Sequence, residues 1–170
     1  MQDDVVVLRD WQRADLPVIE DASRDPYIPS ITSVPVRYTP AEGAAWLERQ
    51  RSQAREGTGY PKAVTLRATG ETVGFATVNG ISRTHRRGAA GYWILRGHRG
   101  HGYARRALAL LPELARDQGL IRLEALVEVD NAASQATCRA AGFVEEGTLR
   151  AYYRIGDRQC DMVLFARILA

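Results

Sequence analysis

The chain contains 170 residues, 45% of them hydrophobic, and carries a formal net charge of +3. This length and apolar content predict a single domain over residues 1–170 with one core. The net charge is too small to indicate a nucleic-acid partner, and no apolar stretch is long enough to span a membrane. Residues 1–10 carry acids where a secretory signal would be basic and apolar, so we expect a cytoplasmic protein.

The two cysteines, Cys138 and Cys160, are too few for a disulfide framework. Neither has a histidine or cysteine neighbour at the spacing of metal ligands, so we expect no metal site. We interpret both as buried thiols, because free cysteine usually behaves as a small apolar side chain.

The first part of the chain predicts a strand, a helix, a loop and a second helix. Val5 to Leu8 is a β-branched run, and a helical stretch follows from Ala14 to Ser23. Three prolines between Asp25 and Tyr38 disfavour regular structure and predict an ordered loop. Thr39 then begins a helix as its N-cap, and Gly57 ends it.

The rest of the chain predicts strands interrupted by two helices. The expected strands cover residues 60–68, 72–81, 89–95, 121–129, 143–153 and 159–168, and the expected helices cover 103–118 and 131–141. Turns at 69–71 and 156–157 join the first two and the last two strands as hairpins. Because hairpins stand at both ends of this order, it predicts an α+β fold with one mixed, mostly antiparallel, twisted sheet flanked by helices.

An unusual distribution of charge marks the centre of the chain. No acidic residue occurs between Glu71 and Glu113, whereas seven arginines and all three histidines do. Within this stretch, residues 96–102 read Arg-Gly-His-Arg-Gly-His-Gly between an expected strand and an expected helix. The first amides of a helix are unpaired and the helix dipole is positive there, so phosphates bind at such ends. Glycines allow close backbone approach, and we therefore predict a pyrophosphate site over residues 96–106; a solvated basic face is the alternative.

Which phosphate ligand binds at this loop is a separate question. The lysine of a nucleoside-triphosphate loop and the spacing of a dinucleotide fingerprint are both absent. Arg99-x-x-Gly102-x-Ala104 instead resembles the Arg/Gln-x-x-Gly-x-Gly/Ala signature of the GNAT superfamily of N-acetyltransferases. The segments 91–95, 131–134 and 142–143 resemble the RimJ/RimL-type branch at the same spacings. The resemblance covers nearly the whole chain and implies the GNAT fold, an N-acetyltransferase, and acetyl-coenzyme A (acetyl-CoA) as its co-substrate.

The resemblance also implies how coenzyme A is held. Its pantetheine arm would lie along the strand before the loop, and its pyrophosphate on the amides that begin the central helix. The implied cofactor-binding residues are Ile94, Leu95, Arg96, Arg99, Gly100, His101, Gly102, Tyr103, Ala104, Arg105 and Asn131. A plain helix cap is the alternative role for Asn131, and the two roles are compatible.

Direct attack of an amine on the acetyl thioester needs a neutral amine, a polarised carbonyl and a proton for the departing thiolate. The resemblance implies that a backbone N–H near Ile94 polarises the carbonyl. Many family members supply the proton from a tyrosine four residues before the closing glycine, but that position is Cys138 here. The resemblance therefore makes Ser134 the expected catalytic residue; a helix serine bonded to nearby backbone is the alternative.

The general base is not identified by any motif. The glutamate that RimJ/RimL-type sequences often carry is Ala89 here, which leaves His85, Glu124, Glu128 or a water relay. An α-amino group has a pKa of about 7.7 to 8.0 and is about a tenth neutral at pH 7, unlike lysine at about 10.4. Without a strong base, we therefore expect a protein or peptide N-terminal α-amine of the ribosomal-protein type as the acceptor.

Three residues are expected to bind the acceptor: Tyr27, His85 and Tyr152. Packing is the alternative role for the two tyrosines. The alternative enzyme acetylates a small amine such as an aminoglycoside or a polyamine. Alternatives from other classes are a non-catalytic coenzyme A-binding homologue and an RNA-binding module. The sequence contains no recognised nucleic-acid motif that would favour the second. We expect no membrane or nucleic-acid partner, and a homodimer is common in the family that the chain resembles.

Overall fold

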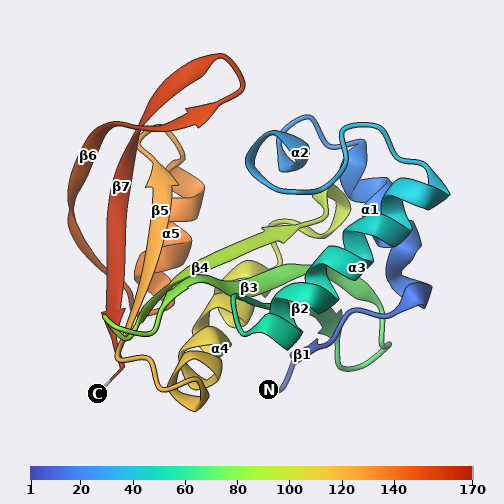
Figure 1. The fold of residues 1–170 in the computed structure, drawn as a ribbon, viewed down its shortest axis with the longest axis horizontal. Coiled ribbons are helices and arrows are strands. Elements are labelled where there is room, and N and C mark those ends of the chain that lie inside the picture. The colour runs from blue at the N-terminus through green and yellow to red at the C-terminus, as the bar shows by residue number, and fades with distance from the viewer. Residues whose placement is uncertain (170) are drawn as a thin grey trace.

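A seven-stranded sheet forms the centre of the molecule in a computed structural model that describes residues 1–169, with the strand order β1-β2-β3-β4-β5-β7-β6 (Figure 1). The strands are β1 (Val6–Arg9), β2 (Tyr60–Leu66), β3 (Thr72–Ser82), β4 (Arg87–Ile94), β5 (Arg122–Glu128), β6 (Val144–Ile155) and β7 (Arg158–Ile168). Neighbouring strands run antiparallel except β4 and β5, which are parallel. The prediction of an α+β fold with one mixed, mostly antiparallel sheet is confirmed.

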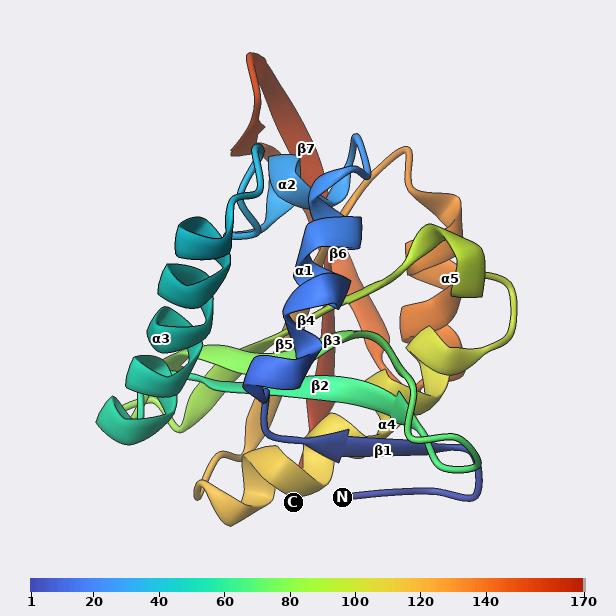
Figure 2. The ribbon, with the colours of Figure 1, turned by 90° about the vertical axis from the view of Figure 1, so that its right-hand side faces the viewer.

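Helices cover both faces of this sheet. They are α1 (Leu16–Ser23), α2 (Ile28–Ile31), α3 (Pro40–Glu56), α4 (Tyr103–Asp117) and α5 (Ala132–Ala140), with short 3-10 turns at Arg13–Asp15 and Arg96–His98. Figure 2 shows α1 in front of the strands with α3 to its left, whereas α4 lies behind β1. No helix within residues 1–169 is long and apolar enough to cross a membrane.

Two hydrophobic clusters fill the two sides of the sheet. The larger one joins α4 and α5 to the strands and includes Leu108, Leu111 and Phe165. The second joins α1 and α3 to the opposite face and includes Trp46 and Trp93. Because side chains alternate along a strand, neighbouring residues of β4 contribute to different clusters. The strand therefore faces α4 and α5 on one side and α1 and α3 on the other.

The helices begin and end where local signals predict. The Thr39 hydroxyl accepts a hydrogen bond from the Glu42 amide at 3.1 Å, and Gly57 ends α3 with a left-handed φ of 68°. The Asn131 side chain accepts from the Ser134 amide at 3.0 Å and caps α5. These caps satisfy backbone groups that a helix cannot pair internally.

The prediction of an irregular loop from Asp25 to Tyr38 is wrong in one part, because α2 interrupts it. The Asp25 carboxylate accepts hydrogen bonds from the amides of Tyr27 and Ile28 at 2.9 and 3.1 Å. Pro29 lies in the first turn, where its missing N–H removes no helix hydrogen bond. The prolines therefore shorten the helix without preventing it.

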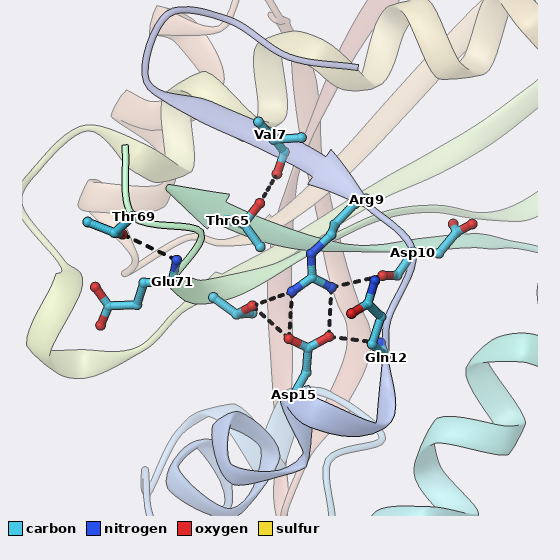
Figure 3. Close-up of polar contacts among 9 residues, drawn as sticks. Val7, Arg9, Asp10, Gln12, Asp15, Thr65, Thr69 and Glu71 are labelled. Atoms are coloured by element: carbon cyan, nitrogen blue, oxygen red, sulfur yellow. Dashed lines mark hydrogen bonds and ion pairs between the residues drawn. The ribbon is translucent and has the colours of Figure 1, made fainter. Parts of the chain in front are cut away.

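A buried ion pair ties the N-terminal strand to the following helix (Figure 3). Arg9 donates two hydrogen bonds to the Asp15 carboxylate, each of 2.7 Å, and a third to the Thr72 hydroxyl at 2.9 Å. The Thr72 hydroxyl and the Gln12 amide also donate to Asp15, both at 2.8 Å. The partners of Asp15 thus come from the segment that runs from β1 to Asp15 and from the start of β3.

The strands β4 and β5 separate along their length, and this separation positions the site. They pair only from Arg87 to Ala89 on β4, opposite residues 122–124 of β5. Beyond that point β4 stays paired with β3, and β5 stays paired with β7 (Figure 1). The edge of β4 that faces β5 is consequently unpaired from Ala90 onward within the described part of the chain.

Candidate functional site

A cavity of about 1180 Å³ occupies the opening between β4 and β5. It extends from the start of α4, past α5, to the face of the sheet covered by α3. Its lining includes the second half of β4, the end of β5 and the loop around α2. One cavity therefore connects the predicted phosphate site with the other side of the sheet.

The start of α4 has the geometry that a phosphate site needs. Gly100 and Gly102 have left-handed φ values of 83° and 77°, and Gly102 is the N-cap of the helix. A Cβ at either position would have no atom within 4 Å, so the space over this backbone is open. Both glycines line the cavity with Tyr103, Ala104 and Arg105. The first backbone amides of α4 therefore lie at the edge of the cavity.

The arginines around this loop have different roles. The Arg99 guanidinium donates to the Asp25 carboxylate at 2.7 Å and to the Ile94 carbonyl at 3.0 Å. Burial would raise the pKa of Asp25, but the two amides and Arg99 outweigh it and lower the pKa. Arg106 pairs with Asp3 and Asp4. Arg99 thus fastens the loop to the segment before α2. Arg99 and Arg105 both line the cavity, and both are exposed.

Ser134 lies in the first turn of α5 and lines the cavity. Its hydroxyl is 2.7 Å from the hydroxyl of Tyr92, which comes from β4 on the other side of the opening. Burial raises the pKa of Tyr92 above its ordinary value. The pair therefore links β4 to α5 across the opening where β4 and β5 are no longer paired.

A second polar chain crosses the cavity from α2 to β5. Tyr27 donates a hydrogen bond to the carboxylate of Glu128 at 2.6 Å, and the Asn131 amide donates to the Tyr27 hydroxyl at 3.2 Å. Arg158 contacts the other carboxylate oxygen of Glu128 at 3.3 Å. Burial and the bond to Glu128 raise the pKa of Tyr27 to about 12. Glu128 is only 6% exposed, so these partners replace water as its hydrogen-bond donors.

The three side chains that the sequence offers as general base lie in different places, and only one of them lines the cavity. His85 lies exposed in the turn between β3 and β4, away from the residues that line the cavity. Glu124 is ion-paired with Arg87 and Arg122 at 3.0 and 2.7 Å and also lies outside the lining. Glu128 is the one of these three side chains that lines the cavity.

The cavity brings together ten of the fifteen site residues expected from the sequence: Tyr27, Ile94, Arg99, Gly100, Gly102, Tyr103, Ala104, Arg105, Asn131 and Ser134. The other five, Leu95, Arg96, His101, His85 and Tyr152, are not part of its lining. Tyr153, the neighbour of Tyr152, does line it. Tyr92 and Arg158 have no place among the expected site residues, because no local signal indicates that their side chains meet Ser134 and Glu128.

Both cysteines are buried, as the sequence predicts. Cys138 lines the inner end of the cavity, one helical turn after Ser134. Burial raises the pKa of its thiol to about 11, so it stays protonated near neutral pH.

The family model of the acetyltransferase (GNAT) domain matches residues 6–144. The chain therefore belongs to the GNAT family of acetyltransferases. This match confirms the predicted family, fold and enzyme class, and with it acetyl-CoA as the family's co-substrate.

Three similar proteins illustrate the relationship. The ribosomal-protein-serine acetyltransferase of Escherichia coli is 31% identical over 112 residues, which cover 65% of this chain and 63% of that protein. Mycobacterium smegmatis RimJ, in complex with CoA-disulfide, is 28% identical with a TM-score of 0.82, covering 96% of this chain and 81% of that one. Spermidine N-acetyltransferase of Vibrio cholerae, in complex with CoA and spermine, is 21% identical with a TM-score of 0.82, covering 98% of this chain and 97% of that one. The last likeness is one of fold alone, so it does not identify the acceptor amine.

Proposed function

We propose that this chain transfers the acetyl group of acetyl-CoA to the N-terminal α-amine of a protein or peptide. The observation that carries the proposal is the charge of the cavity. Among the described residues that line it, Glu128 is the only carboxylate, and it already contacts Tyr27 and Arg158. A polyamine carries several positive charges that each need a partner when they leave water, whereas an α-amine carries one at most.

The side of the cavity under α3 supports a peptide as the acceptor. Its lining there is uncharged and includes Gln50, Trp46 and Thr77. An uncharged polar lining suits a peptide main chain, which offers hydrogen-bond donors and acceptors but no charge.

Coenzyme A fits the other end of the cavity. Its pyrophosphate would lie on the amides around Gly100 and Gly102, next to Arg105, and its pantetheine arm along the free edge of β4. The thioester would then lie near Ser134, which we assign as the residue that hands a proton to the departing thiolate. Glu128 would accept the proton that the amine loses.

The acceptor is tested with two matched peptides and spermidine. One peptide has a free α-amine and a blocked lysine, and the other has a blocked α-amine and a free lysine. We expect turnover of the first peptide only, because at pH 7 its amine is about a tenth neutral and lysine less than a thousandth. Faster acetylation of the lysine peptide or of spermidine would refute the proposal.

The phosphate site is tested by adding a negative charge. Replacing Gly100 by Asp is expected to weaken coenzyme A binding about tenfold in calorimetry, because a carboxylate at the start of α4 repels the pyrophosphate. Gly100→Asn is the matched control, since it meets the same left-handed φ of 83° without adding a charge. Equal effects of the two variants would place the pyrophosphate elsewhere.

A further inference from the structure

The contact between Tyr92 and Ser134 bears on how Ser134 can donate a proton. Ser134 is the side chain assigned to the departing thiolate, yet a serine hydroxyl is a much weaker acid than a thiol or a phenol. The ordinary pKa is about 8.5 for a thiol and about 10 for a tyrosine. A serine that gives its proton to the sulfur must therefore be supplied with another proton at the same time.

Tyr92 is placed to supply it. Its hydroxyl is 2.7 Å from the Ser134 hydroxyl, within the range of a strong hydrogen bond between two hydroxyls. The Tyr92 side chain is half-buried and lies against α5 beside Thr137 and Cys138. Either hydroxyl can donate in this contact, and with Tyr92 as the donor the Ser134 proton is free to point into the cavity.

Cys138 occupies the position where many family members carry a proton-donating tyrosine. That position lies on α5, one turn after Ser134, and its thiol is too buried to ionise readily. Tyr92 reaches the same region from β4, on the opposite side of the opening. A phenol is thus present beside the inner end of α5 although α5 itself carries none.

We propose that Tyr92 acts through Ser134 as the source of the proton that the departing thiolate of coenzyme A receives. This inference rests on the proposed acetyl transfer. The amine nitrogen bonds to the acetyl carbon, and the carbon–sulfur bond breaks with its electron pair on sulfur. The sulfur takes the Ser134 proton while the Ser134 oxygen takes the Tyr92 proton. The proton that the amine loses passes to Glu128 and from there, through water in the open cavity, to the Tyr92 oxygen, so no net charge remains.

The kinetic test uses Tyr92→Phe, Ser134→Ala and the double variant, with Tyr38→Phe as the control. Tyr38 packs in the second hydrophobic cluster and is not part of the cavity lining. We expect Tyr92→Phe to lower kcat about 10- to 100-fold with an unchanged KM for acetyl-CoA, because proton donation affects only the chemical step. The double variant should be no slower than Ser134→Ala, since both residues act as one unit.

The number of protons that move in the chemical step distinguishes a proton-donating Tyr92 from a purely structural one. The parent protein should show a curved dependence of kcat on the deuterium fraction of the solvent, because two protons move together. Tyr92→Phe should show a straight line. A kcat within twofold of the parent, or losses in the two single variants that add fully in the double variant, would overturn the proposal.

A crystal structure with coenzyme A provides a test that needs no turnover. The sulfur should lie within hydrogen-bond distance of the Ser134 hydroxyl, with Tyr92 still bonded to Ser134; a sulfur elsewhere would overturn the relay. The proposal of a peptide acceptor and the proposal of a Tyr92–Ser134 relay can be refuted independently. Activity on a small amine but on no peptide would refute the peptide acceptor, and the kinetic test would then use that amine.

Discussion

An Asp15→Asn variant is expected to lose about 3–5 kcal/mol of unfolding free energy, the usual cost of removing one partner of a buried ion pair. The Asp15 side chain is 6% exposed and that of Arg9 is 28% exposed. The substitution removes the charge that Arg9 and Thr72 contact and leaves the guanidinium without its partner (Figure 3). Urea denaturation followed by tryptophan fluorescence measures the loss.

Asp10→Asn is the matched control. Asp10 pairs with Lys62, but its side chain is 83% exposed, and pairs in water contribute less than about 1 kcal/mol. A similar loss in both variants would show that the burial of Asp15 is unimportant.

The same ion pair predicts a pH dependence of stability. Burial would raise the pKa of Asp15, but hydrogen bonds from Arg9, the Gln12 amide and Thr72 outweigh it and hold the pKa below 3.8, its ordinary value. A depressed pKa gives stability that is present above the unfolded value and is lost as the pH falls through the folded one. The difference in unfolding free energy between the parent and Asp15→Asn should therefore be constant from pH 5 to 7 and shrink below about pH 4. A constant difference down to pH 2.5 would contradict this.

A Glu128→Gln variant is expected to lower kcat about 100-fold or more, the usual contribution of a general base. Glutamine keeps the shape of the side chain and still accepts the hydrogen bond from Tyr27, so the fold and the KM for acetyl-CoA should change little. Steady-state kinetics with the α-amine peptide measure the effect.

Glu124→Gln is the control on the same strand. Glu124 lies outside the cavity lining and pairs with Arg87 and Arg122, so its kcat should stay within about twofold of the parent. A Glu128→Gln enzyme with more than a third of the parent's kcat would remove Glu128 from the mechanism.

Most of the secondary structure is determined by signals only a few residues long. The Thr39 cap, the end of α3 at Gly57 and the Asn131 cap each depend on neighbouring residues, and all three occur as predicted. The glycine-rich start of α4 is local in the same sense, since its φ values and its helix follow one another in the chain. The helical turn within the Asp25 to Tyr38 segment was missed because a proline is compatible with the first turn of a helix.

The composition of the site depends instead on contacts between distant parts of the chain. Tyr27 and Glu128 are 101 positions apart, and Tyr92 and Ser134 are 42 apart. The selection of Glu128 over His85 follows from the point at which β4 and β5 stop pairing. The sequence by itself determined the family, most strands and helices, and the glycine-rich loop before α4, because these depend on local spacing. Only the tertiary structure decided which acid and which phenol face the cavity, because strand register and sheet opening result from the packing of the whole chain.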